Sequence, residues 1–403
     1  MSISRRTFVA GATALGLAKV RTGSSSSRVI PSSDRFDPWI EIDPAALRHN
    51  VREVARLVGN RPILAVVKNN AYGLGLSTVC PVLDTMSEIA GFAVVKSSAA
   101  IELRELGIRK PILLMGMFAQ SDSGELAAHN ISISLYTDDA GTLVGRMAQQ
   151  TGRPVDAHLY LDTGMGRMGM AYHRADEWIK DLAARDDLSI AGIFMAFTEE
   201  TDFDREQLER LGGVVSRARE SGVRLGQVHA ASSNAVFHLP EAHLDMVRPG
   251  IALYGAYPSE PATEARMSTL HPAFRLKARV VRVEQLRPGD SVSYGRKYIA
   301  ERPTWIATVP VGHSDGYSRR AVEGARVLIG SSLYPVVGAV SASHAILEVG
   351  NEKKVSVGDV ATLVGPDRPE IKPNAVADAI GISVYDVLMH MNPGLPKAVV
   401  SGK

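Results

Sequence analysis

A lysine that ends an apolar run just before a glycine-containing turn is the first residue of this sequence with a candidate chemical role. The run 63–67 is apolar throughout and lies between Pro62 and the pair Asn69-Asn70, which predicts a short buried strand. Lys68 then stands where this strand leaves the core. Lysines are seldom buried unless paired, and burial lowers a lysine's pKa and makes its amine a Schiff-base nucleophile. The alternative is a strand-end lysine that reaches into solvent.

Further apolar runs follow at regular intervals, and amphipathic helical patterns separate most of them. Eight such runs predict an α/β fold, a (β/α)8 TIM barrel. The runs are 63–68, 91–96, 111–116, 131–136, 156–162, 191–197, 227–232 and 251–255. An open doubly wound sheet is the alternative, but no GxGxxG motif opens a first strand–helix turn. Barrel enzymes carry their catalytic residues at the carboxyl ends of strands, where Lys68 lies.

The character of the chain changes after about residue 270. Short segments rich in β-branched residues alternate there with turns such as RPGD and SVGD, which predicts a separate, mostly antiparallel β domain. The 403 residues suit two domains. We therefore expect a barrel over 36–270 and a C-terminal β domain over 271–403, with a helix in ADAIGISVYDVLMHM near the end.

The composition excludes several classes of protein. Hydrophobic residues make up 45% and charged residues 22%, as in ordinary globular proteins with a large core. The net charge is only +2 and no basic run interleaves with aromatic residues, so nucleic-acid binding has no support. The single cysteine, Cys80, excludes an intramolecular disulfide, and no CxxC motif or His/Cys cluster indicates a metal site.

The N-terminus differs from the rest of the chain. Arg5 and Arg6 precede an Ala/Gly-rich apolar segment of 11 residues, 8–18, which is too short to span a membrane stably. Paired arginines before a weakly hydrophobic stretch resemble a twin-arginine export signal, and the Ser/Arg-rich residues 19–33 are typical of a linker. We expect residues 1–35 to be signal and linker, and the protein to be exported to the periplasm. An unstructured tail is the alternative.

Over roughly residues 38–400 the sequence resembles the alanine racemase family of fold-type III enzymes that use pyridoxal 5'-phosphate (PLP). The stretch AVVKNNAYGLG (65–75) is similar to the PLP-lysine motif of that family. The resemblance implies that Lys68 binds PLP covalently and that Tyr72 lies in the site. It also implies a barrel followed by a β domain, and an enzyme that interconverts L- and D-amino acids.

Three more segments of the barrel resemble family motifs in the same order. LDTGMGRMG (161–169) implies that Arg167 bonds the phenolic oxygen of PLP or the carboxylate of the substrate. HAASSNA (229–235) implies that Ser233 helps to hold the phosphate, as hydroxyl and backbone N–H groups can. VRPGIALYG (247–255) implies that Arg248 faces the pyridine nitrogen and that the backbone of Gly250 and Ile251 binds the phosphate.

The resemblance extends to two tyrosines of the second domain. SVSYGRKY (291–298) implies that Tyr294 is the second catalytic residue, and ISVYDVL (382–388) implies that Tyr385 binds the phosphate. In the family the catalytic tyrosine comes from the partner subunit, so the resemblance implies a homodimer with shared active sites. Because arginine stays protonated, Arg248 would leave the pyridine nitrogen unprotonated. Two-base racemisation tolerates this, since Lys68 and Tyr294 would exchange the α-proton on opposite faces.

Several positions depart from the family pattern. A histidine that stacks on the cofactor and bonds the arginine beside the pyridine nitrogen is replaced by Ala196, and a lysine that is often carbamylated is replaced by Tyr160. The Met-Asp pair of the second domain becomes Ala342-Ser343, two small residues that would enlarge the space around the substrate. The tyrosine of a GYADG-like segment becomes His313, which could replace it, supply a proton or be an ordinary surface histidine.

These departures leave more than one function open. The first interpretation is an amino-acid racemase, for alanine or a broader set, with a wider pocket. The second is another PLP reaction, such as decarboxylation, aldol cleavage or transamination, because a free tyrosine has a pKa of about 10 and needs help to act as a base. A non-catalytic cofactor-binding protein is the third.

Overall fold

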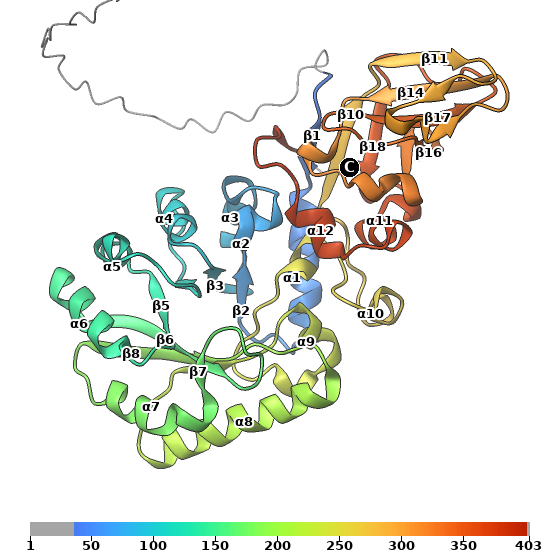
Figure 1. The fold of residues 1–403 in the computed structure, drawn as a ribbon. Helices are drawn as coiled ribbons and strands as arrows, with labels where there is room; N and C mark the ends of the chain where they lie inside the picture. Colours follow the sequence, from blue (N-terminus) through green and yellow to red (C-terminus); the bar gives the residue numbers. More distant parts are fainter. Residues whose placement is uncertain (1–35, 401–403) are drawn as a thin grey trace, which may run out of the picture.

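The computed structural model describes residues 36–400, which form two domains (Figure 1). The expected export signal, 1–35, lies outside the described residues. Within 36–400 no helix is long and apolar enough to cross a membrane. No group of histidine, cysteine and acidic residues in the same range could hold a metal ion.

The first domain is the predicted barrel. Its strands are parallel and buried on both faces, because side chains fill the interior and helices cover the outside. In their order around the barrel, the strands are β2 (Ile63–Val66), β3 (Ile89–Val94), β4 (Ile112–Leu114), β5 (Ser132–Leu135), β6 (Val155–Asp162), β8 (Leu188–Phe194) and β9 (Gln227–His229). The short strand β7 (Met170–Ala171) pairs with β6 at the edge of this sheet.

Helices cover the outer surface of the barrel. Helix α1 begins where the Asp43 side chain accepts hydrogen bonds from the first turn, and its buried residues recur at intervals of three and four. The helices of this domain and of the linker after it are α1 (Pro44–Leu57), α2 (Lys68–Tyr72), α3 (Leu76–Asp84), α4 (Ser97–Glu105), η1 (Gln120–Asp122), α5 (Ser123–Ala128), α6 (Ala140–Thr151), η2 (Tyr172–Arg174), α7 (Ala175–Ala183), α8 (Thr201–Glu220), α9 (Ser233–His238), η3 (Pro240–Ala242), η4 (Ile251–Tyr254) and α10 (Pro261–Met267).

The barrel closes at a place that the sequence pattern misidentifies. Val247 forms a parallel bridge with Ile63, and the amide of Val66 donates to the carbonyl of Pro249 at 3.0 Å. The stretch before Gly250 therefore takes the eighth position around the barrel. The prediction of a strand at 251–255 is wrong. Those residues form the 3-10 helix η4, because an apolar run of this length suits a buried helical turn as well as a strand.

The second domain is the predicted, mostly antiparallel β domain. Its large sheet has the order β11-β14-β17-β16-β15-β18-β10-β1-β19, and a hairpin of β12 and β13 stands apart. The elements after the linker are β10 (Phe274–Arg279), β11 (Arg282–Leu286), β12 (Ser291–Val292), η5 (Tyr294–Arg296), β13 (Tyr298–Ile299), β14 (Thr304–Val309), η6 (His313–Asp315), η7 (Arg319–Glu323), β15 (Arg326–Ile329), β16 (Ser332–Val337), β17 (Ala345–Gly350), β18 (Val360–Val364), η8 (Pro369–Ile371), α11 (Pro373–Ile380), α12 (Val384–Met389) and β19 (Lys397–Val399).

One strand of the second sheet precedes the barrel in the sequence. Strand β1 (Trp39–Ile42) pairs antiparallel with β10 and parallel with β19, whereas the sequence places it with the barrel. Ile40 of this strand is fully buried. The barrel is thus inserted between two strands of one sheet, which ties the two domains together at both ends.

Helix α12 is the element of the second domain that reaches the mouth of the barrel (Figure 1). It contacts α2, and it also packs closely on Gly73, which directly follows α2 and has a φ of +86°. A Cβ on Gly73 would lie 2.7 Å from the carbonyl oxygen of Leu388 and 2.9 Å from the Cβ of Met391. Only glycine allows this approach, so Gly73 sets the distance between the barrel mouth and α12.

The pairing of β1 with the second sheet gives a stability prediction. We expect Ile40→Ala to lower the free energy of unfolding by about 2–5 kcal/mol, the usual cost of removing a buried isoleucine side chain. The measurement is urea unfolding followed by circular dichroism. Val399→Ala, at an exposed residue of neighbouring β19, is the control and should change the free energy by less than about 0.5 kcal/mol. Equal effects of the two substitutions would contradict a structural role for β1.

Candidate active site

Lys68 lies at the mouth of the barrel, directly after β2, and opens an unusual turn. The next four residues, 69–72, have φ values of 53°, 56°, 51° and 55°, which make one turn of left-handed helix. Left-handed backbone costs roughly 1–2 kcal/mol per residue outside glycine. Asparagine tolerates it best, and the side chain of Asn70 accepts a hydrogen bond from the amide of Leu76 at 3.0 Å. The turn thus holds the lysine at a fixed position.

The surroundings of Lys68 favour its neutral amine. Its side chain is half-buried, and burial lowers the pKa of Lys68. The guanidinium of Arg167 lowers that pKa further, whereas the carboxylate of Glu199 raises it. A lysine with a lowered pKa can act as a nucleophile or as a base near neutral pH.

Three tyrosines surround the left-handed turn. The ring of Tyr72 lies 4.8 Å from that of Tyr254 and 6.4 Å from that of Tyr385, which α12 contributes from the second domain. Burial raises the pKa of Tyr72 and of Tyr385, so both hydroxyls remain protonated and can donate hydrogen bonds. A Cβ at Gly250 would collide with the Tyr72 hydroxyl. The predicted Tyr72, Gly250 and Tyr385 therefore meet at one place.

The predicted phosphate-binding serine faces the same place. The Ser233 hydroxyl accepts hydrogen bonds from the amides of Gly250 at 2.9 Å and Ala252 at 3.3 Å. The Gly250 amide, which the sequence assigns to the phosphate, thus donates to Ser233. The two amides that donate to Ser233 flank the predicted Ile251. The hydroxyl of Ser232 is buried, makes no well-formed hydrogen bond within 36–400 and lies near the carboxylate of Glu199. A buried hydroxyl without a partner is the feature that a bound phosphate oxygen would satisfy.

These residues fit PLP. The aldehyde of this cofactor needs a reactive amine, which Lys68 supplies, and its phosphate needs hydrogen-bond donors without a bulky side chain in the way. Ser232, Tyr72 and Tyr385 are such donors, and the missing Cβ of Gly250 lets the Tyr72 hydroxyl approach the backbone there.

Arg248 is buried beneath the site in a network of histidines. Its guanidinium donates to Nδ1 of His229 at 2.8 Å and to the carbonyl of Met195 at 2.6 Å. Nε2 of His229 lies 2.8 Å from Nδ1 of His158. Arginine only donates, so Nδ1 of His229 accepts and Nε2 of His229 carries the proton. Nε2 of His229 therefore donates a hydrogen bond to Nδ1 of His158.

The same network keeps a single positive charge in the core. Burial, and then the charge of Arg248, lowers the pKa of His158 to about 4 and that of His229 well below its ordinary value. Both histidines are therefore neutral near pH 7. Burial lowers the pKa of Arg248 to about 10, which still leaves it protonated. The guanidinium also lies 5.0 Å from the ring of Phe194.

The sequence misplaces the histidine partner of this arginine. The resemblance puts the partner at the position of Ala196 and treats it as lost, but His229 bonds Arg248 from the end of β9. The backbone carbonyl of Ala196 accepts a hydrogen bond from Gln207 instead. Tyr160 stacks on Phe194 with ring centroids 4.3 Å apart and contributes aromatic packing beneath the site. What Ala196 removes is therefore a side chain at the mouth, not the support of Arg248.

Arg167 lies on an exposed loop between β6 and β7. The carboxylate of Asp162 shapes this loop by accepting hydrogen bonds from the amides of Gly164 at 2.9 Å and Gly166 at 3.1 Å. In the described part of the chain, the Arg167 side chain has no hydrogen bond or ion pair. Its charge still acts on Lys68. An arginine of this kind can bind a carboxylate that enters the mouth of the barrel.

The remaining predicted residues do not reach Lys68 in one chain. Tyr294 is 77% exposed, and the hydroxyl of preceding Ser293 donates to the carbonyl of Ala339, just after β16. Figure 1 shows β16 far from β2 and α2. Ala342 is exposed, and its carbonyl accepts from the amide of Ser314 at 3.0 Å. Nε2 of His313 accepts a hydrogen bond from Arg319 at 2.8 Å. The single chain thus assembles the amine, the arginines and the phosphate donors, but not the second base.

Sequence reasoning missed three residues of the site. His158 and His229 are polar residues within apolar strands, a pattern that signals a buried hydrogen bond. The sequence did not single out Glu199, because it stands among other acidic residues in a polar stretch. Its φ is +66°, and burial, followed by the charge of Asp204, raises its pKa.

Comparisons with known proteins agree with this geometry. The family model "Alanine racemase, N-terminal domain" matches residues 42–258, and "Alanine racemase, C-terminal domain" matches 273–399. The chain is 34% identical over 372 residues to an alanine racemase of Desulforamulus reducens, covering 90% of this chain and 98% of that one. It is 36% identical to an alanine racemase of Geobacter sp. (strain M21) over 361 residues, 87% of this chain and 94% of that one.

Solved structures show the same similarity. The alanine racemase of D-cycloserine-producing Streptomyces lavendulae superposes with a TM-score of 0.86 at 28% identity and covers 92% of this chain and 98% of its own. The alanine racemase of Bacillus anthracis with bound L-Ala-P superposes with a TM-score of 0.80 at 28% identity, over 91% of this chain and 95% of its own.

The charges around Lys68 predict that two substitutions shift the pKa of its amine in opposite directions. Arg167→Gln removes a charge that lowers the lysine's pKa, so the pH at which its amine becomes reactive should rise. Glu199→Gln removes a charge that raises this pKa, so that pH should fall. The measurement is the rate at which the apoprotein condenses with PLP as a function of pH. Glu209→Gln, an exposed carboxylate on α8, is the control, and shifts of the same sign in both variants would refute this account.

Proposed function

The chain belongs to the alanine racemase family, and from this membership we infer that it is a PLP-dependent amino-acid racemase in which Lys68 and Tyr294 are the two bases. The observation that carries the inference is the position of Lys68. A half-buried lysine with a lowered pKa stands at the carboxyl end of β2, and the fold brings the hydroxyl groups of Tyr72, Tyr385 and Ser232 to the same end of the barrel.

The residues of this chain divide the work of racemisation between them. When PLP is bound, it withdraws electrons from the α-carbon of an amino acid and so makes its α-hydrogen acidic. Arg167 binds the substrate carboxylate and thereby orients the α-carbon. Lys68, whose amine is neutral more readily than that of an ordinary lysine, accepts or returns a proton on one face. Arg248, buried beneath the site, stays charged and would hold its positive charge next to the bound cofactor, because its histidine neighbours are neutral.

Racemisation needs a second proton donor on the opposite face, and Tyr294 is proposed to supply it from a partner subunit. The side chain of Tyr294 is 77% exposed. Its turn is stiff, because Ser293 and Arg296 have φ values of 64° and 51° and the Ser293 hydroxyl bonds the carbonyl of Ala339 at 2.9 Å. A rigid turn that presents a tyrosine to solvent suits a residue that completes the site of another chain. The proposal is a homodimer with two shared active sites.

The substrate is an amino acid, with alanine as the first choice. Ala342 and Ser343 carry short side chains on an exposed loop of the second domain. If this loop meets the partner's barrel together with Tyr294, it leaves space for side chains larger than a methyl group. The alternative of another PLP reaction receives no support from the comparisons, since the matching relatives are named alanine racemases.

Mixing two inactive variants tests the shared sites. We expect Lys68→Ala to abolish PLP attachment, and Tyr294→Phe to slow racemisation by about 10²–10⁴, the usual contribution of a general acid or base. In a mixture of equal amounts, half of the dimers are mixed and each has one intact site, so about one quarter of the wild-type sites return. The measurement is chiral chromatography of L- and D-alanine before and after subunit exchange.

A second measurement on Tyr294→Phe separates the two bases. In deuterated water, the enantiomer whose α-hydrogen faces Lys68 should still exchange it, whereas the other enantiomer should not. Equal exchange of both enantiomers would show that another group, such as His313, is the second base. A mixture that recovers no activity although subunits have exchanged would contradict the shared site.

We also propose that the protein is exported through a twin-arginine signal. The support is the pair Arg5-Arg6 before the apolar segment 8–18. Replacing both arginines with lysine should retain the protein, with an intact N-terminus, in the cytosol, while the unchanged protein should be recovered from the periplasm in processed form. The measurement is cell fractionation with mass spectrometry of the N-terminus. Unchanged protein found only in the cytosol, with its N-terminus intact, would refute export.

A further inference from the structure

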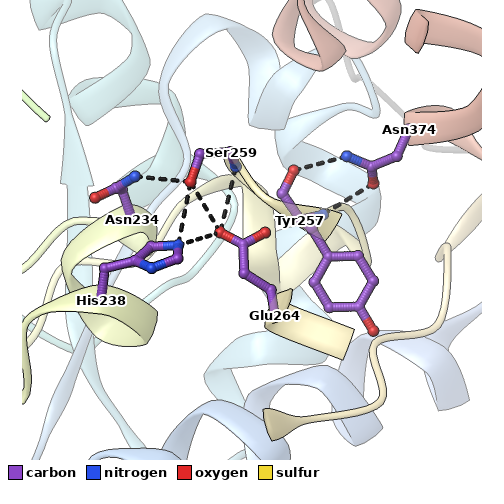
Figure 2. Close-up of polar contacts among 6 residues, drawn as sticks. All are labelled: Asn234, His238, Tyr257, Ser259, Glu264 and Asn374. Carbon is purple, nitrogen blue, oxygen red and sulfur yellow. Dashed lines mark hydrogen bonds and ion pairs between the residues drawn. The ribbon is translucent and has the colours of Figure 1, made fainter. Parts of the chain in front are cut away.

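A network of four polar side chains lies beside α9, the short helix that begins with Ser233 (Figure 2). Glu264 of α10 is fully buried at its centre. Nε2 of His238 lies 2.8 Å from Oε1 of Glu264, and the Ser259 hydroxyl donates to the same oxygen at 2.9 Å. The Asn234 side chain donates to the Ser259 hydroxyl at 2.9 Å.

The directions of these hydrogen bonds follow from the groups involved. The Ser259 amide also donates to Oε1 of Glu264, at 3.3 Å, so three donors converge on one oxygen. Since the Ser259 hydroxyl gives its proton to the carboxylate, its lone pairs accept from Asn234. Nε2 of His238 also lies 3.2 Å from the Ser259 hydroxyl oxygen, so His238 contacts both residues of the linker (Figure 2). Within the described residues, Oε2 of Glu264 has no partner.

The network holds α9 at two positions. Asn234 and His238 are four residues apart, so they lie on the same face of this helix. Their partners, Ser259 and Glu264, come from the linker between the domains. The hydroxyl of Ser233, the first residue of α9, is bonded to the amides of Gly250 and Ala252. The position of Ser233 and of neighbouring Ser232 therefore depends on both ends of this short helix.

The second domain holds the same linker. Figure 2 shows the side chain of Asn374 on the backbone of Tyr257. Asn374 donates to the Tyr257 carbonyl at 2.8 Å and accepts from its amide at 3.0 Å. Asn374 belongs to α11, which packs on α12, the helix that carries Tyr385. The linker thus contacts α9, which carries the serine side of the phosphate site, and α11, which packs on the helix that carries Tyr385.

We propose that Glu264 is a positioning residue for the phosphate of the cofactor, an inference that rests on the proposed function. Glu264 does not touch the cofactor. It fixes α9 by contacting His238 directly and Asn234 through Ser259. The start of α9 in turn positions Ser232 and Ser233 for the phosphate.

A carboxylate at this place needs an explanation other than stability. Burying an ion costs several kcal/mol, and an apolar side chain of the same size is often as stabilising or more so. The convergence of three donors on one oxygen gives direction, which an apolar contact would not. Orientation of α9 is therefore the property that Glu264 adds.

The experiment compares two ligands that differ only in the phosphate. Dissociation constants of PLP and of pyridoxal are measured for the full-length apoprotein by equilibrium dialysis, with the wild type and Glu264→Met. Methionine keeps the length of the side chain and removes the acceptor. PLP should bind about tenfold more weakly, the factor that corresponds to one lost hydrogen bond to a charged group. Pyridoxal should change by less than about twofold, because it makes no phosphate contacts.

Two further variants decide the outcome. Glu260→Met changes an exposed carboxylate of the same linker and should leave both constants unchanged. Ser259→Ala, at an exposed residue, removes the hydroxyl that joins Asn234 to Glu264 but leaves the contact between His238 and Glu264. It should weaken PLP selectively even if Glu264→Met does not fold. Unchanged constants, or equal weakening of both ligands in the folded variants, would overturn the positioning role. A wild-type protein that binds neither ligand would instead refute the proposed function.

Discussion

The left-handed turn after β2 is the constraint on which the site depends. Four consecutive residues other than glycine in this conformation cost several kcal/mol together, and such backbone persists only where its surroundings determine it. The second domain supplies part of this support, because α12 packs on Gly73 at the end of the turn. The position of Lys68 is consequently a property of both domains. The insertion of the barrel between β1 and β10 keeps the second domain where it can give this support.

Burial explains the charges of the site. Burial of groups at the carboxyl ends of the strands disfavours their charged forms, and each group responds according to its neighbours. Lys68 loses part of its basicity to burial and to Arg167, while Glu199 opposes the change. His158 and His229 are neutral, because burial and the charge of Arg248 lower the pKa of both. The result is one permanent positive charge beneath the cofactor site and one amine that can exchange a proton.

The sequence predicts the parts of this site that are local. The apolar run before Lys68 and the motif around it place the amine at a strand end, and the alternation of patterns predicts the barrel. The run 251–255 shows the limit, since a short apolar stretch suits a strand or a buried turn equally. The pairing of β1 with β10 and the bond between His229 and Arg248 join segments far apart in the chain or at different strand ends. Glu264 lies in PATEARM, a charged stretch of the linker, and its burial against His238 and Ser259 depends on contacts that the local pattern does not show.

The division of the phosphate site between two domains gives the linker a function beyond connection. Ser232 and Ser233 belong to the barrel, whereas Tyr385 belongs to α12, so their separation is set by whatever fixes one domain on the other. Gly73 sets the approach of α12 from the side of the turn. Asn374 and Glu264 set it from the side of the linker, through hydrogen bonds whose directions allow little rotation. Because these contacts lie on different sides of the site, a shift of either domain would move the hydroxyls apart. The phosphate donors are therefore positioned by the packing of the whole chain.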